Sequence, residues 1–202
     1  DCAGASTLAP VRVNTTDFND VDPAIAAQDG QVIVAWGTDN GEQPSNLSLR
    51  YRRMRSSGEF LDAEDRILPN EGNAWMPSLS AGEGGTWHLA GVRAGETEFR
   101  IFETTIDADG DTGALFAPEP EGPGTQLGPA LLVRDGARWL AWGQEENVRL
   151  ASADGIETLP GLAPSLGWGP NGPLLGWTDG LQVAVRDLNR DVTTRFSEPN
   201  KQ

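Results

Sequence analysis

The side chains in this sequence that could do chemistry are mostly carboxylates. The chain of 202 residues carries 30 Asp and Glu against 15 Lys and Arg, which gives a formal net charge of -15. His, Cys and Tyr occur once each. The single His, His88, lies within an expected strand, so a Ser-His-Asp triad has no obvious base, and one His cannot make a His-rich metal site. What remains is carboxylate chemistry, either attraction of cationic groups or the paired acids that cleave a glycosidic bond.

Many of these acids fall in segments expected to connect strands on one face of the fold. Loops that are rich in acids and poor in bases would steer a cationic partner as it approaches, although a plain solvated face is the alternative. We expect this face to bind a protein partner, or a glycan, with one tryptophan as an aromatic anchor. The expected partner-binding residues are Asp17, Asp20, Asp22, Asp39, Glu42, Glu71, Trp75, Glu145 and Glu146.

This pattern favours a non-catalytic binding or assembly module. The alternative is a glycan-active enzyme of the glycoside hydrolase class, which needs two carboxylates on the same face, about 5–10 Å apart. A binding module would show scattered, solvated carboxylates, whereas an enzyme would show a pocket with a convergent pair. Nucleic acid is a disfavoured partner, because it requires a local basic surface.

A second acidic motif is Asp107–Gly113, DADGDTG, which places Asp107, Asp109 and Asp111 at alternate positions. Alternate carboxylates on a tight loop can wrap Ca²⁺, so this loop is a candidate calcium site. It is not an EF-hand, because Thr112 and Pro118 stand where that motif requires Gly and Glu. A plain Asp-Gly hairpin turn is the alternative.

The elements that would position these residues follow an internal repeat. The stretch Asp22–Trp36, DPAIAAQDGQVIVAW, recurs at Met76–Gly91, Gly128–Trp142 and Ala163–Trp177. In each copy a Pro opens a short apolar strand, a Gly-containing turn follows, and a second strand comes next. Three copies end in Trp thirteen residues after the Pro, and such recurrence favours packing between repeats over ligand binding. The prolines are Pro23, Pro77, Pro129 and Pro164.

Two further strands follow in each copy, and no segment keeps a helical periodicity. The sequence therefore predicts an all-β fold, a small β-propeller with four blades of four antiparallel strands. We expect a flexible leader at 1–9 and a single propeller domain at 10–202, with blades near 22–69, 76–118, 128–160 and 163–198. Pro10–Asn14 is expected to be the strand that closes the ring, which leaves Thr194–Ser197 as a surplus strand. The alternative is a half-ring completed by a second chain.

Two motifs are interpreted as structural. Ser80–Trp87, SAGEGGTW, is similar to a sialidase Asp-box, but Gly82 replaces the Asp. Arg50, Arg100 and Arg149 recur in third strands, far from the ring axis, so we do not expect them to converge on a ligand.

The run PVRVNTT, followed by DPAIAAQDGQVIVAW and LSLRYRRMRSSG, resembles secreted and surface bacterial β-propellers of the broad sialidase-like group. The resemblance implies an extracytoplasmic propeller, periplasmic, cell-surface or secreted, but no particular activity. No stretch approaches the length of a transmembrane helix. A lipid anchor on Cys2 is conceivable, although Asp1 before it disfavours lipoprotein processing.

Overall fold

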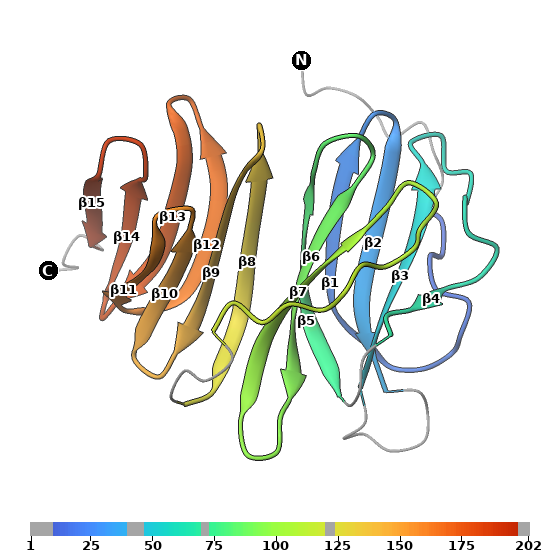
Figure 1. Ribbon diagram of the computed structural model, residues 1–202, viewed down its shortest axis with the longest axis horizontal. Coiled ribbons are helices and arrows are strands. Elements are labelled where there is room, and N and C mark those ends of the chain that lie inside the picture. The colour runs from blue at the N-terminus through green and yellow to red at the C-terminus, as the bar shows by residue number, and fades with distance from the viewer. Residues whose placement is uncertain (1–9, 40–46, 70–72, 120–123, 198–202) are drawn as a thin grey trace, which may run out of the picture.

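The computed structural model describes residues 10–39, 47–69, 73–119 and 124–197, and every regular element among them is a strand. The strands form four antiparallel sheets, here called blades 1 to 4 (Figure 1). Blade 1 contains β1 (Asp20–Gln28), β2 (Gln31–Thr38), β3 (Ser48–Arg55) and β4 (Arg66–Ile67). Blade 2 contains β5 (Ala74–Ala81), β6 (Trp87–Ala94) and β7 (Phe99–Ile106). Blade 3 contains β8 (Gln126–Arg134), β9 (Ala137–Gln144), β10 (Asn147–Ser152) and β11 (Gly155–Pro160). Blade 4 contains β12 (Leu162–Gly169), β13 (Gly172–Asp179), β14 (Gln182–Asp187) and β15 (Val192–Ser197).

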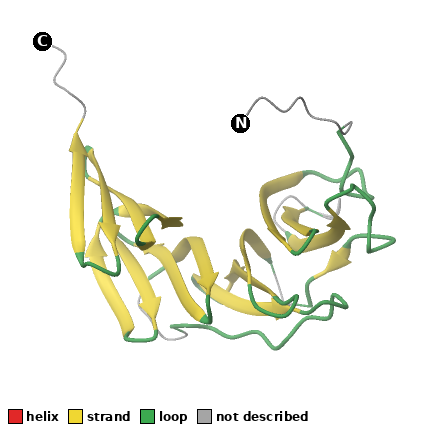
Figure 2. Ribbon diagram, turned by 90° about the horizontal axis from the view of Figure 1, so that it is seen from above, coloured by secondary structure: helices red, strands yellow, loops and turns green. Residues whose placement is uncertain are grey.

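Each blade runs from its first strand to its last in sequence order. The first strands lie side by side, since β1 contacts β5, β5 contacts β8 and β8 contacts β12. Seen from above, the four blades form an open arc, with blade 1 at one end and blade 4 at the other (Figure 2). The prediction of an all-β fold built from four antiparallel blades is confirmed.

The four repeated prolines occupy equivalent positions. Each follows a residue with a positive φ, and at each the pairing of first and second strand shifts register, as in a β-bulge. The residues before the prolines are Asp22 (φ 51°), Met76 (φ 51°), Gly128 (φ 60°) and Ala163 (φ 52°). Positive φ is costly for Met and Ala, so its recurrence shows that the fold imposes this bend on every innermost strand.

The blades adhere through apolar faces, and two of the three repeated tryptophans, Trp142 and Trp177, lie in these interfaces. Trp142 of blade 3 is fully buried in a cluster with Val92 and Ile101 of blade 2. Trp177 of blade 4 packs in the same way with Ala141 and Val148 of blade 3. These two tryptophans thus face the preceding blade, and the structure agrees with a packing role for both of them.

Blade 2 lacks this tryptophan because another ring occupies its place. A Cβ added to Gly91 would lie 2.8 Å from Cζ of Phe102. Phe102 is fully buried in the cluster that joins blades 1 and 2, together with Ile33 and Leu49. An aromatic ring from the third strand therefore does here what a second-strand tryptophan does elsewhere.

Four expectations, three about the ends of the chain and one about blade 2, need correction or lie outside the described residues. Pro10–Asn14 forms no strand, so the predicted ring closure is wrong. Thr194–Ser197 is not surplus either, because it belongs to β15, the fourth strand of blade 4. Blade 2 has only isolated bridges, Glu103 to Phe116 and Ile106 to Thr112, where its fourth strand was expected. The expected leader at 1–9 falls outside the described residues.

Replacing Trp142 with Ala should lower the free energy of unfolding by roughly 3–5 kcal/mol, because it opens a cavity between blades 2 and 3. The control is Trp168→Ala, since Trp168 is 40% exposed, meets Trp139 edge-on and has the Arg134 guanidinium over the face of its ring. Trp168→Ala should lower the free energy of unfolding by at most about 1–2 kcal/mol. Chemical denaturation measures both changes, and equal losses would contradict the packing role.

Candidate functional site

The acidic residues of the predicted binding face lie at one end of the strands, where each first strand begins. Asp20 pairs with Thr38 across β1 and β2, so the segment before β1 and the segment after β2 meet there. Asn19 joins them, because its side-chain amide donates to Asp39 Oδ2 over 2.6 Å. Asp17 is exposed and pairs with Arg12 at 2.5 Å. The structure therefore brings Asp17, Asp20 and Asp39 together around one end of blade 1.

A groove of about 330 Å³ opens beside these acids, between the segment 10–14 and the uncovered face of blade 1. Its walls are mainly apolar, and its polar groups come from both the segment 10–14 and β1. The lining residues are Arg12, Val13, Asn14, Asp20, Val21, Pro23, Val34 and Trp36. This volume is at the lower end of the range for small-molecule sites, and the combination of apolar walls with a few fixed polar groups is typical of them.

Hydrogen bonds hold the segment that forms the outer wall. The Arg52 guanidinium donates to the Val13 carbonyl at 2.7 Å, and the Thr15 N–H donates to Asp65 Oδ1 at 2.9 Å. On the groove side, the Asn14 amide donates to Asp20 Oδ2 at 2.5 Å. Asp20 is therefore oriented at the rim by a neighbour from the opposite wall.

Asp22 lies in β1 between two residues that line the groove, Val21 and Pro23. It is exposed, and it is the one carboxylate among the four residues that precede the repeated prolines. Its φ of 51° is tolerated by Asp better than by most residues. The bulge that every blade contains thus presents a carboxylate in blade 1 alone, next to Asp20.

Trp36 forms the floor of the groove, and it is only 4% exposed. Its equivalent in blade 4, Trp177, donates its indole N–H to the Pro160 carbonyl at 2.9 Å. The indole N–H of Trp36 has no partner among the described residues, as is also true of the fully buried Trp142. Trp36 differs from Trp142 in that its ring lines an open groove, although its indole nitrogen is itself buried.

The other residues of the predicted binding face do not join this groove. Trp75 is half-buried against blade 3 and contacts Phe99 edge-on, with ring centroids 4.8 Å apart. Glu145 and Glu146 form the turn between β9 and β10, and Glu145 lines a separate pocket of about 140 Å³ with Glu119. Glu42 and Glu71 lie outside the described residues.

The recurring third-strand arginines bind different partners, as expected. Arg50 lies 3.7 Å from Asp65 in its own blade. Arg100 donates to the Gly124 carbonyl at 2.7 Å, and Arg149 pairs with Glu119 at 2.5 Å. Two of the three thus attach the connection between blades 2 and 3, and the three do not converge.

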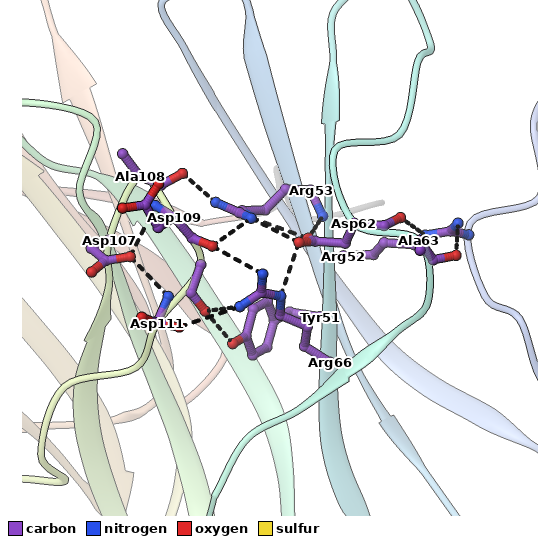
Figure 3. Close-up of polar contacts among 11 residues, drawn as sticks. Tyr51, Arg52, Arg53, Asp62, Ala63, Arg66, Asp107, Ala108, Asp109 and Asp111 are labelled. Atoms are coloured by element: carbon purple, nitrogen blue, oxygen red, sulfur yellow. Dashed lines mark hydrogen bonds and ion pairs between the residues drawn. The ribbon is translucent and has the colours of Figure 1, made fainter.

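The loop predicted to bind Ca²⁺ is held by arginines (Figure 3). Arg53 donates to the carbonyls of Ala108 and Asp109, and Arg66 donates to those of Asp109 and Gly110. Both guanidinium groups also pair with Asp62, at 2.7 Å from Arg53 and 2.9 Å from Arg66. Asp62, Arg53 and Arg66 together tie blade 1 to the loop of blade 2, and we call them the arginine latch.

The carboxylates of that loop do not gather around an ion site. Asp107 Oδ1 accepts the backbone N–H groups of Asp109 and Asp111, at 3.0 and 2.8 Å, as in an Asx turn. Among the described residues, no group of three His, Cys, Asp or Glu side chains is placed to hold a metal ion. The geometry therefore supports the alternative interpretation, a hairpin turn. The carboxylates of Asp107, Asp109 and Asp111 do not form a Ca²⁺ site in this structure.

Burial and charge shift the pKa of several interior groups. Burial alone would raise the pKa of Asp62, but hydrogen bonds and positive charge from Arg53, with the charge of Arg66, bring it below its usual value. Burial raises the pKa of Glu103, and Arg138 partly offsets this. Burial also lowers the pKa of His88, with a further contribution from Arg138. Glu103 and His88 lie near the interface of blades 2 and 3, away from the groove, and they are structural.

Sequence reasoning missed Arg12, Asn14 and Val13 as parts of a site. The alternation in PVRVN indicated a strand, and nothing in the segment itself shows that it would cover blade 1 instead. Asp20 and Asp22 were found because they belong to an acidic cluster before a repeated proline.

Asp62→Asn should destabilise the fold by roughly 3–5 kcal/mol near pH 7, because it leaves two arginines of the latch without their carboxylate. The native pKa of Asp62 is lowered, so its contribution is complete above the ordinary pKa and is lost as the pH falls through the native one. The difference between wild type and variant should therefore shrink below about pH 4. The control is Glu59→Gln, which removes an exposed pair with Arg55 and should cost less than about 1 kcal/mol. If the variant's loss of unfolding free energy were the same at low pH as at pH 7, this role of Asp62 would be contradicted.

Millimolar Ca²⁺ should leave the melting temperature unchanged, because only an ion that prefers the folded state raises it. Asp109→Ala should behave identically with and without Ca²⁺ in differential scanning fluorimetry. A calcium-dependent rise that Asp109→Ala abolishes would restore the predicted metal site.

No protein-family model matches the chain, and no curated protein sequence matches it either. No helix in the described part of the chain has the length and apolar character needed to cross a bilayer.

Solved structures do resemble it. A family 117 glycoside hydrolase from Zobellia galactanivorans superposes with a TM-score of 0.61 at 13% identity, over 93% of this chain and 73% of that one. The GH43_1 enzyme from Xanthomonas citri, complexed with xylotriose, gives 0.59 at 16% identity, over 91% and 72%. A structure from the GH130 family of mannoside phosphorylases, which contains glycoside hydrolases that target β-1,2 mannosidic linkages in Candida mannan, gives 0.58 at 16% identity, over 90% and 71%.

At these identities the likeness establishes the fold. It also corrects the preferred interpretation of the sequence, a non-catalytic binding or assembly module. The structures that share the fold are glycoside hydrolases, and they agree better with the alternative, a glycan-active enzyme. This chain has the β-propeller fold that such enzymes use.

Proposed function

We propose that the protein is a glycoside hydrolase whose site is the groove between the segment 10–14 and blade 1. The observation that carries the proposal is a carboxylate on the wall of this groove, Asp20, with a second carboxylate, Asp22, two residues along the same strand. Asp20 lines it, and Asp22 lies between two lining residues. The shared fold with glycoside hydrolases supports the same class of reaction.

The groove has the chemistry that a sugar ring requires. Val34 and Trp36 provide an apolar and aromatic surface for the faces of the ring, and Arg12 provides donors for its hydroxyl groups. The groove is open at its rim, so a chain of several sugars can extend from it.

Hydrolysis of a glycosidic bond needs one carboxyl group that protonates the leaving oxygen and a second that activates water or attacks the sugar carbon. Residues two apart on an extended strand have Cα atoms roughly 6–7 Å apart. That separation is compatible with a sugar bound between Asp20 and Asp22. The bulge at Asp22 turns its side chain relative to a regular strand, and bulges commonly aim catalytic side chains in this way.

Glycans of cell walls and surfaces are the substrate class we assign. This choice is consistent with the extracytoplasmic location that the sequence resemblance implies, which we retain as part of the proposal. The carboxylates of the groove serve in catalysis, and the remaining acids keep the protein soluble.

Wild-type protein should release reducing sugar from at least one member of a panel that contains xylotriose, xylan and β-1,2-linked manno-oligosaccharides. Asp22→Asn and Asp20→Asn should each reduce kcat by about 10²–10⁴-fold, because each removes a group that transfers a proton or attacks carbon. An aryl glycoside with an activated leaving group needs no acid. The variant that lacks the acid should therefore keep most of its activity on that substrate, whereas the other variant should not.

The matched control is Asp135→Asn. Asp135 has the same φ of 51° but lies in the turn between β8 and β9, at the opposite end of the strands. It should retain full activity. No turnover on any substrate, or equal losses in all three variants, would reject the groove as a hydrolytic site.

A further inference from the structure

A second cavity, a cleft of about 220 Å³, lies between blades 3 and 4 and is separate from the groove of blade 1. Blade 3 contributes Trp139, Ser152, Asp154 and Glu157 to its walls, and blade 4 contributes Arg186 and Leu188. Trp139 stands near the start of β9, and Ser152 ends β10. The cleft therefore lies at the opposite end of the strands from the groove and its acids.

The cleft exists because blade 4 has a short turn where blade 2 has a long loop. Trp139 is equivalent to Ile33 of blade 1, since each pairs with the residue three positions after the repeated proline. Ile33 is fully buried, with Leu115 packed against its cluster and the loop 107–113 held over blade 1 by the arginine latch. After its third strand, blade 4 has only the turn 188–191. Trp139 thus lines an open space instead of being enclosed.

The polar wall of the cleft is fixed by ion pairs that join the two blades. Arg186 Nη1 donates to both carboxylate oxygens of Glu157, at 2.8 and 2.9 Å, and Arg186 Nε donates to Asp191 Oδ1 at 2.9 Å. The Arg186 side chain is only 15% exposed. Because these groups are already ordered, a ligand that binds them pays little for immobilising side chains.

The aromatic part of the wall is also held in place. Trp139 is half-buried, and it contacts Trp168 edge-on with ring centroids 6.1 Å apart. The Arg134 guanidinium lies 4.5 Å from the centroid of the Trp168 ring. A supported tryptophan ring beside ordered polar groups combines an apolar contact surface with fixed hydrogen-bonding positions.

We infer that this cleft is a second glycan-binding site, which takes one neutral sugar residue. The carboxylates of Asp154 and Glu157 accept hydrogen bonds from hydroxyl groups, and the Arg186 guanidinium donates them. Trp139 provides a surface for the ring. A hydroxyl group both donates and accepts, so a sugar can use every part of this wall. The two carboxylates repel an anionic ligand, and Arg186, which already holds Glu157, repels a cationic one.

The size of the cleft limits what it can hold. Its volume is below the roughly 300–1,000 Å³ of sites that enclose a drug-sized ligand, so one ring enters and the rest of a glycan stays outside. Asp154 and Gly155 at the rim are exposed and leave room for the continuing chain. Contacts to a single ring correspond to a Kd of about 1–10 mM. On a polymeric glycan, a weak second site raises the overall affinity when both sites are engaged.

The test is an NMR titration of the Asp20→Asn, Asp22→Asn double variant, in which the proposed hydrolysis is disabled, with xylotriose and with β-1,2-linked manno-oligosaccharides. At least one sugar should shift the indole N–H signal of Trp139, with a Kd of about 1–10 mM. The signal is assigned by its loss in Trp139→Phe. Because the shift is read in a protein with an intact cleft, it does not depend on how well any cleft variant folds.

Adding Asp154→Asn should weaken this binding about tenfold, because it removes a charged acceptor at the rim. The matched control is Glu146→Gln, since Glu146 is an exposed carboxylate of the same blade in the turn between β9 and β10. That variant should bind like its parent. Hydrolysis in the groove need not change in Asp154→Asn, so this inference can fail while the proposed function stands. A Trp139 signal that no sugar shifts, or equal losses from Asp154→Asn and Glu146→Gln, would overturn the inference.

Discussion

The structure depends on one constraint, which is that a blade has two apolar faces and cannot bury both by itself. Each blade solves this with its neighbour, and large rings such as Trp142 and Trp177 cross from one sheet to the preceding one. Phe102 replaces the missing tryptophan between blades 1 and 2, where Gly91 leaves room for it. Burial of this kind makes the main favourable contribution to the free energy of folding. In the described part of the chain no helices cover the sheets, so the blades must cover one another.

The two ends of the arc meet the same constraint in different ways. At blade 1, the segment 10–14 lies over the face that contains Trp36, and the space left between them is the groove with Asp20 on its rim. At blade 4, Leu162, Val183 and Phe196 remain in solvent. The covering of the blade 1 face thus creates the candidate site. Polar anchors fix the first arrangement, because Arg52 holds Val13 while the arginine latch holds blade 1 to blade 2.

The sequence predicted those features that the repeat itself encodes. Four prolines at one repeat position indicated four equivalent innermost strands, and recurring tryptophans indicated packing between blades. The features that it could not predict depend on contacts between segments that are far apart in the sequence. PVRVN has the alternation of a strand, and only its docking on Val34 and Trp36, through Arg52 and Asp65, makes it a groove wall. Asp107, Asp109 and Asp111 have the spacing of ion ligands, but arginines distant in sequence take the carbonyls of that loop. Asp20 and Asp22 were identified as part of an acidic face, without their role in a groove, because that requires both walls.

The most direct test of the central claim, that the groove of blade 1 holds a glycan for hydrolysis, is a crystal structure of the Asp22→Asn protein soaked with xylotriose and β-1,2-linked manno-oligosaccharides. The account predicts an oligosaccharide in the groove, with one sugar ring against Trp36 and a glycosidic oxygen within hydrogen-bond reach of residue 22 or Asp20. An oligosaccharide bound on another surface, with the groove empty, would contradict it.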